Sequence, residues 1–188
     1  MNYPQILLKN LFASALISLL VACAAYKTQP PDIDLSRVHP SGAHRLAFDP
    51  DGKKLASGGL HGKVRIWSVE DGSAIMTLTG HQDPVRGLAW LDGKRLISAD
   101  RAGRILLRDL PSSRVLASLQ LKAVANMALA PDRSWLLVIG GTRLYKLALP
   151  SLQMLAQLDT GSRLLSVAVI HGTGRVALSG RRPGSVAG

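Results

Sequence analysis

The stretch AIMTLTGHQDPVRGLAWLDGKRLISADRAGRILLRD, residues 74–109, contains the pattern that decides the fold. Its four short apolar runs are separated by turn signals: a Gly-His loop, an Asp-Gly turn and a loop containing Gly103. Short strands at this spacing, joined by tight turns, are typical of antiparallel sheet. We therefore expect one strand that ends at Leu78 and three more over residues 85–90, 95–98 and 105–108.

The same pattern recurs on both sides of this stretch. In four places a triplet with a central alanine is followed by a polar turn and a second apolar run, and the alanines are 42, 39 and 40 positions apart. Such agreement predicts an internal repeat of about 40 residues, which is the first feature to establish in a fold. The triplets are Leu46-Ala47-Phe48, Leu88-Ala89-Trp90, Met127-Ala128-Leu129 and Val167-Ala168-Val169.

Several short motifs resemble the WD-repeat family of β-propellers. They are Gly80-His81, the turn Asp49-Pro50-Asp51-Gly52, Ser57-Gly58-Gly59 and Val64-Arg65-Ile66-Trp67. In that family each unit of about 40 to 45 residues forms a four-stranded blade. The resemblance covers residues 39–180 and implies an all-β fold of four-stranded antiparallel blades. About three and a half blades are expected within residues 39–188, near 39–79, 80–119, 120–159 and 160–188.

The resemblance also implies structural positions inside each blade. The family holds a blade with hydrogen bonds among a loop His, a Ser or Thr, a turn Asp and a Trp. His39, His81 and Trp67 stand at such positions, and Asp109 retains the terminal Asp of the signature.

Other members of that hydrogen-bonded set are replaced. Arg108 stands where the second unit should have its Trp, and Asp100 lies close enough in sequence to be a substitute partner for His81. We therefore expect a divergent propeller that is held by packing rather than by a complete polar network. The remaining replacements are Gln120 and Thr160 at the later His positions, and His61 and Ala102 at the turn Asp positions.

Residues 1–22 are interpreted as a signal peptide. Lys9 precedes an uncharged run of 15 residues, Leu11 to Ala25, which is short for a membrane span. The sequence Leu20-Val21-Ala22-Cys23 resembles the bacterial lipoprotein signal, which implies cleavage before Cys23 and lipid attachment to its sulfur. In the alternative interpretation, Cys23 is a small residue of an ordinary signal peptide or of an uncleaved anchor.

Residues 23–38 follow as the lipidated cysteine and a tether. Pro30-Pro31 and the lack of periodicity indicate an extended segment, with Ile33 to Leu35 as an extra edge strand in the alternative. The lipoprotein resemblance implies a location in the bacterial cell envelope, anchored to a membrane and facing the periplasm. Ala24 stands where many inner-membrane lipoproteins carry Asp, which favours the outer membrane.

The formal net charge of +11 suggests two kinds of anionic partner, an acidic protein or lipid head groups. Nucleic acid is disfavoured, because aromatic residues are only 4% of the chain and do not alternate with the basic ones. The alternative is that most basic residues are solvated and have no partner.

The length is short for a closed propeller. From His44 to Gly188 there are 145 residues, whereas propellers typically close with four to eight blades. Three explanations follow: the chain is part of a longer protein, two copies complete one propeller as a homodimer, or the strands form a smaller assembly.

No pattern of a catalytic or metal site is present in the sequence. The five histidines, His39, His44, His61, His81 and His171, have no second His or Cys at ligand spacing on one strand. A nucleophile elbow, a phosphate-binding glycine loop and a haem-attachment motif are also missing from the sequence. We therefore expect a protein that is not an enzyme and has no cofactor.

Two functions of different class remain. The first is a non-catalytic, lipid-anchored scaffold that binds protein partners in the envelope through its propeller loops. The alternative is the N-terminal propeller portion of a longer envelope enzyme or sensor, whose catalytic part lies beyond residue 188. Gln82, Asp83 and Arg101 are candidate surface contacts in the loops.

Overall fold

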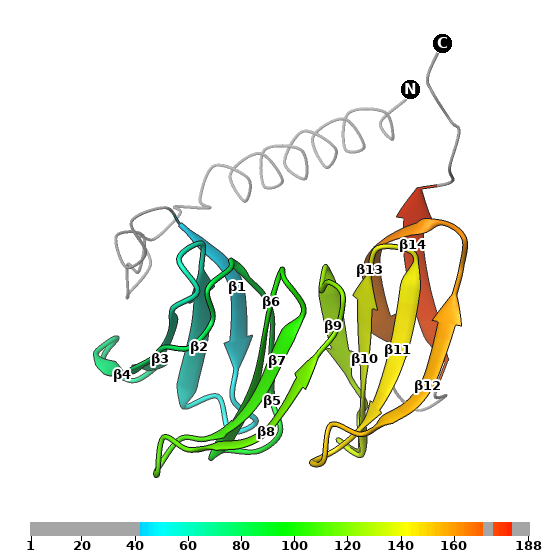
Figure 1. Ribbon diagram of the computed structural model, residues 1–188. Coiled ribbons are helices and arrows are strands. Elements are labelled where there is room, and N and C mark those ends of the chain that lie inside the picture. The colour runs from blue at the N-terminus through cyan, green and yellow to red at the C-terminus, as the bar shows by residue number, and fades with distance from the viewer. Residues whose placement is uncertain (1–41, 171–174, 182–188) are drawn as a thin grey trace, which may run out of the picture. The chain divides into compact units, whose positions relative to one another are not determined.

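The computed structural model describes residues 42–170 and 175–181, which form fourteen β-strands in four antiparallel sheets (Figure 1). The expected signal peptide, Cys23, the tether and His39 lie outside the described residues. In each sheet every strand pairs with the next one in sequence. The first sheet contains β1 (Ala43–Phe48), β2 (Lys54–Gly59), β3 (Val64–Ser68) and β4 (Ala74–Leu78).

The later sheets repeat this order. The second contains β5 (Val85–Trp90), β6 (Arg95–Asp100), β7 (Arg104–Asp109) and β8 (Val115–Gln120). The third contains β9 (Asn126–Leu129), β10 (Trp135–Gly140), β11 (Arg143–Ala148) and β12 (Met154–Asp159), and the fourth contains β13 (Arg163–Val169) and β14 (Val176–Arg181). The prediction of an all-β chain with propeller blades, the last of them incomplete, is confirmed.

The strand bounds follow the turn signals closely. β5 has the expected bounds, whereas β6 continues two residues beyond the expected Ser98, because Asp100 still pairs with Val85. Among the described residues no helix is long and apolar enough to cross a membrane.

The alanine triplets lie on the first strand of each sheet, and these inner strands contact one another in the order β1, β5, β9, β13. The central alanines, among them Ala47 and Ala89, pack on the core between their own sheet and the next one. A small side chain suits this position, because neighbouring inner strands approach closely there. Trp90 Nε1 even donates a hydrogen bond of 2.9 Å to the carbonyl of Ala47.

The residues that flank each central alanine point the other way, into the core shared with the preceding sheet. Trp90 fills the core between the first and second sheets, Met127 that between the second and third, and Val167 that between the third and fourth. Leu46 and Phe48 hold the same positions in the first sheet, but they are 61% and 62% exposed. The repeat thus has a direction. In the second, third and fourth sheets, a residue beside the central alanine packs into the core shared with the preceding sheet.

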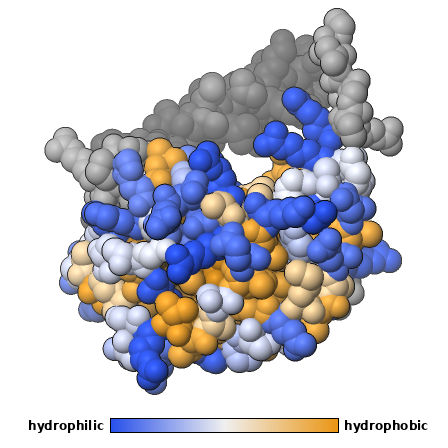
Figure 2. Space-filling model, viewed as in Figure 1, coloured by the Kyte–Doolittle hydropathy of each residue, from blue (hydrophilic) through white to orange (hydrophobic). Residues whose placement is uncertain are grey.

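The outermost strands present apolar side chains to solvent. Figure 2 shows hydrophobic residues gathered on the face in view, between hydrophilic ones, over the region of these outer strands. Large hydrophobic side chains are exposed at the following positions of β4, β8 and β12: Ile75, Val115, Leu116, Met154, Leu155 and Leu158.

A glycine in the turn between the second and third strands brings each of the first two sheets close to the next one. Gly103 has φ +100°, and a Cβ there would lie 2.2 Å from the carbonyl oxygen of Leu121, which enters the third sheet. Gly62 has the same relation to His81, which enters the second sheet. These turns accept only glycine, because L side chains avoid positive φ and a Cβ would overlap backbone atoms.

The substitution Gly103→Ala should therefore destabilise the protein by about 3 kcal/mol, from backbone strain together with the clash on Leu121. Gly141→Ala is the matched control, because Gly141 also has positive φ but nothing lies within 4 Å of its Cβ position. That control should cost only the strain, about 1 kcal/mol. Urea denaturation followed by circular dichroism measures both, and equal losses would show that the close approach contributes nothing.

Candidate functional site

A buried hydrogen-bonded group joins the loop before β5 to β6. His81 Nδ1 lies 3.0 Å from Asp100 Oδ2, and His81 Nε2 lies 2.8 Å from Ser98 Oγ. A carboxylate only accepts hydrogen bonds, so Nδ1 carries the proton and Nε2 accepts from the serine hydroxyl. The expected pairing of His81 with Asp100 is therefore present, and the second sheet is held by a polar network as well as by packing.

The same three residue types form the catalytic triad of hydrolases, but here burial excludes that role. Ser98 is 1% exposed and Asp100 is 2% exposed, so no substrate carbonyl can reach the serine oxygen. Asp100 also accepts a hydrogen bond of 2.9 Å from the backbone N–H of Arg104, which ties the turn between β6 and β7 to the group. The arrangement is a structural brace for the loop.

Burial lowers the pKa of His81 below its ordinary value of 6.5, and the hydrogen bond to Asp100 offsets only part of this effect. Arg108 and Arg104 lower it further by charge repulsion. His81 is therefore neutral at neutral pH, in agreement with its role as donor to one partner and acceptor from the other.

Two arginines donate hydrogen bonds to the Gly-His loop, and one of them, Arg108, stands where the WD-repeat family has a tryptophan. Arg108 donates through Nη2 to the carbonyl of Thr79, and Arg104 Nη1 donates to the carbonyl of Gly80 at 3.0 Å. Burial and the neighbouring Arg104 lower the pKa of Arg108. In the first sheet the tryptophan is present, and Trp67 Nε1 donates to Ser57 Oγ at 2.8 Å inside the protein.

Asp109 has a local role. Its Oδ2 accepts hydrogen bonds from the backbone N–H and the hydroxyl of Ser112, which stabilises the turn between β7 and β8. The Ser112 hydroxyl and then its N–H lower the pKa of the Asp109 carboxyl. Of the four structural positions expected from the sequence, the structure describes Trp67, His81 and Asp109, and they lie in separate groups.

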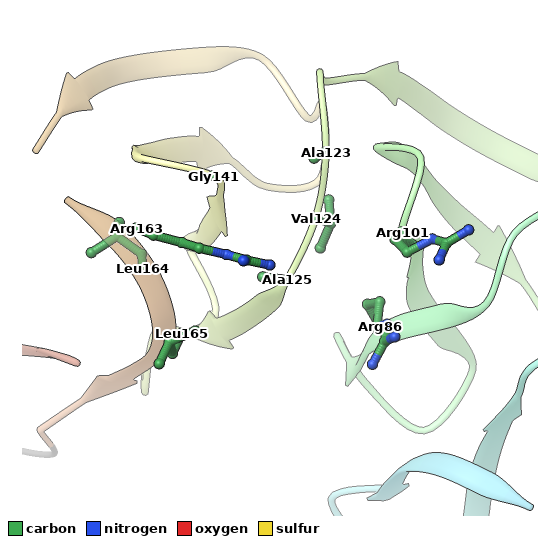
Figure 3. A pocket seen from close by; sticks show the side chains of 9 residues that line it. All are labelled: Arg86, Arg101, Ala123, Val124, Ala125, Gly141, Arg163, Leu164 and Leu165. Atoms are coloured by element: carbon green, nitrogen blue, oxygen red, sulfur yellow. The ribbon is translucent and has the colours of Figure 1, made fainter. Parts of the chain in front are cut away.

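A cavity of about 450 Å³ opens at the end of the sheets where the inner strands β5, β9 and β13 begin (Figure 3). Val124, Leu164 and Leu165 give it an apolar part, and Arg86, Arg101 and Arg163 contribute positive charge. Arg163 points across the cavity toward Ala125, whereas Arg86 and Arg101 lie on the other side (Figure 3). The remaining lining residues are Ala123 and Gly141.

Arg45 ties the inner strands together beside this cavity. Its Nε donates to the carbonyl of Arg86 at 2.8 Å, and its Nη2 donates to the carbonyl of Ala125 at 3.3 Å. One guanidinium from β1 thus fixes backbone atoms of β5 and of the segment that enters β9.

The loop residues expected at the surface differ in their surroundings. Gln82 is exposed, and Asp83 is paired with Arg101 at 2.9 Å. Of the three arginines that line the cavity, only Arg101 is expected from the sequence as a surface contact; Arg86, Arg163 and the neighbouring Arg45 carry no motif that singles them out. The available signal was position, because Arg45 and Arg86 lie two and three residues before the central alanines Ala47 and Ala89.

A metal centre has no support in residues 42–170 and 175–181, where no group of three or more His, Cys, Asp or Glu side chains is placed to hold an ion. His44 lies in β1, and His61 lies in the turn between β2 and β3.

The depressed pKa of His81 predicts a pH dependence of stability. In the unfolded state His81 takes up a proton as the pH falls below 6.5, whereas the buried residue of the folded state stays neutral to lower pH. The free energy of unfolding therefore falls as pH drops from 7.5 to 5.5. The slope in this window is at most about 1.4 kcal/mol per pH unit. His81→Gln should be less stable at pH 7.5 and show a flatter dependence. Urea denaturation at several pH values tests this, and parallel curves for the two proteins would contradict it.

Part of the chain is similar to a known protein family. Residues 35–68 and 72–109 match the WD40 model, described as WD domain, G-beta repeat. A periodic tryptophan protein 2 homolog of Caenorhabditis elegans is 31% identical over 98 residues, which are 51% of this chain and 11% of that protein.

Two further relatives have shorter or similar matches. WD repeat and SOCS box-containing protein 1 of Homo sapiens is 33% identical over 106 residues, 53% of this chain and 25% of that protein. The 26S proteasome regulatory subunit RPN14 of Saccharomyces cerevisiae is 37% identical over 62 residues, 33% of this chain and 15% of that protein. The chain spans a quarter or less of each of these relatives. Residues 35–68 and 72–109 are thus similar to WD repeats, and the sheets that follow have the same strand order.

Proposed function

We propose that this protein is a non-catalytic interaction scaffold that binds protein partners through its propeller loops and is anchored by lipid on Cys23 in a bacterial cell envelope. The observation that supports this most is the combination of WD repeats with a loop-lined cavity at one end of the blades. Repeated sheets with interlocked cores form a rigid support, on which loops can present side chains in fixed positions.

The relatives support an interaction role by what their names state. RPN14 is named as a regulatory subunit of the 26S proteasome, which makes it a member of an assembly of several proteins. The human relative is named for a SOCS box in addition to its WD repeats, so there the repeats accompany another module. Protein binding by this chain follows by analogy only.

The proposal that the protein is not catalytic rests on the sequence and on the burial of one group of side chains. Ser98, His81 and Asp100 are the residues with the composition of a catalytic triad, and all three are buried and satisfied by one another. A general base needs contact with substrate, whereas His81 is buried and both of its ring nitrogens are engaged with Asp100 and Ser98.

Lipid anchoring rests on the sequence around Cys23. Two or three acyl chains on one residue give stable attachment, because each buried methylene contributes about 0.8 kcal/mol whereas a single chain binds only marginally. The blades would then stand on a tether of residues 23–38 at the periplasmic side, with the outer membrane favoured by Ala24.

The anchor predicts a specific modification. Cells grown with an alkyne fatty acid should label the wild-type protein, and Cys23→Ser should abolish the label and release the protein from the membrane fraction. Gel fluorescence after dye coupling measures the label, and fractionation measures the location. Unlabelled wild-type protein, or label that persists in Cys23→Ser, would rule out lipidation at this residue.

The scaffold role predicts a defined partner. The full-length protein, immobilised in mild detergent, should enrich at least one envelope protein above a control resin, and the purified pair should bind with a measurable Kd. In the destabilised variant Gly103→Ala, binding should fall in proportion to any loss of folded protein. If nothing binds in any extract fraction, the scaffold proposal fails.

A further inference from the structure

We propose that the cavity beside Arg86 and Arg163 binds an acidic segment of the partner protein, with an apolar side chain between its carboxylates. This inference rests on the proposed scaffold function and assigns that function a site and a ligand chemistry. It begins from the placement of two arginines on opposite sides of one cavity (Figure 3).

The first step concerns charge. No ion pair in residues 42–170 and 175–181 involves Arg86 or Arg163, and neither side chain donates a hydrogen bond there. Arg45 adds a third positive charge where its guanidinium contacts the carbonyls of Arg86 and Ala125. Within the part of the chain that the structure describes, no carboxylate therefore neutralises the charges of Arg86 and Arg163 at this end of the blades.

Carboxylates near the same end are already engaged. Asp83 pairs with Arg101, Asp100 is buried against His81, and Asp159 pairs with Arg143 at 3.7 Å. None of them is left to pair with Arg86 or Arg163. An incoming anion would meet an uncompensated positive field, which raises the rate of encounter and favours acidic partners.

The second step concerns the apolar part of the cavity. Val124 and Leu164 are buried, while Leu165 is 54% exposed and offers its side chain to whatever enters. An apolar wall between two cationic sides suits a ligand that has a hydrophobic group between separated anionic groups. An acidic peptide with an apolar residue has this pattern, whereas an inorganic phosphate has a single compact charge.

Nucleic acid fits this cavity poorly. Single-stranded nucleic acids are bound through stacking of bases on aromatic side chains, and none of the nine lining residues is aromatic. Guanidinium groups bind carboxylates through two parallel hydrogen bonds, so Arg86 and Arg163 could each take one acidic side chain of an extended peptide.

The test uses the full-length protein in non-ionic detergent and a fluorescein-labelled octapeptide of alternating glutamate and leucine. Fluorescence anisotropy should show binding that weakens with added NaCl. Arg163→Glu and Arg86→Glu should each raise the Kd at least tenfold, and Leu165→Ser should raise it several-fold. Arg114→Glu is the matched control, since Arg114 is exposed in the turn between β7 and β8 at the other end of the blade, and its Kd should stay within twofold of wild type.

Four outcomes would overturn the proposal. They are equal binding of a peptide with glutamine in place of glutamate, unchanged binding by both charge-reversal variants, an equal loss in Arg114→Glu, and competition by pyrophosphate or a short DNA strand at lower concentration than by unlabelled peptide. Circular dichroism of each variant, with Arg163→Gln as a milder change, separates loss of the site from loss of the fold.

The same variants distinguish this inference from the scaffold proposal. If a captured partner still binds the Arg86→Glu, Arg163→Glu double variant as tightly as wild type, the cavity is not its site while the scaffold role stands. If no partner binds the wild type at all, the scaffold role fails, whatever the peptide does.

Discussion

The close packing of the inner strands is the constraint on which the rest of the structure depends. Ala47, Ala89 and Ala128 give the neighbouring strand room, and the residues beside them fill the core shared with the preceding sheet. The three clusters of buried residues all lie between sheets, so a sheet gains its stability from its neighbours. The packing of the inner strands fixes the angle between neighbouring sheets, and this angle positions the loops and the cavity.

Side-chain hydrogen bonds add to this packing, and in the second sheet other residue types make them than in the first. Where Trp67 donates one hydrogen bond to a buried serine, the corresponding Arg108 turns toward the backbone of the Gly-His loop and bonds Thr79. Ser98 is then free to bond His81, and Asp100 takes the place of the missing turn Asp. The family's set of contacts is thus redistributed over different residue types, and the loop remains held.

Much of the architecture could be predicted from the sequence, because strand alternation and turn residues are local signals. The alanine triplets predict the number and order of the sheets, and the short sequence separation makes Asp100 a candidate partner of His81, which the structure confirms. The cavity could not be found in this way, since Arg86 and Arg163 are 77 positions apart and belong to different sheets. Their relation depends on the angle between sheets, and no local pattern encodes that angle.

The sharing of each core by two sheets has a consequence for how the molecule loses its structure. The second sheet packs on both faces, against the clusters around Trp90 and around Ile105. Within residues 42–170 and 175–181, the fourth sheet packs on one face, through Leu164 and Val167. Within the described sheets, local unfolding should therefore begin at the first and fourth sheets and proceed inward. Residues of the second, third and fourth sheets line the cavity, so a ligand that bridges Arg86 and Arg163 would also hold the fourth sheet to the others.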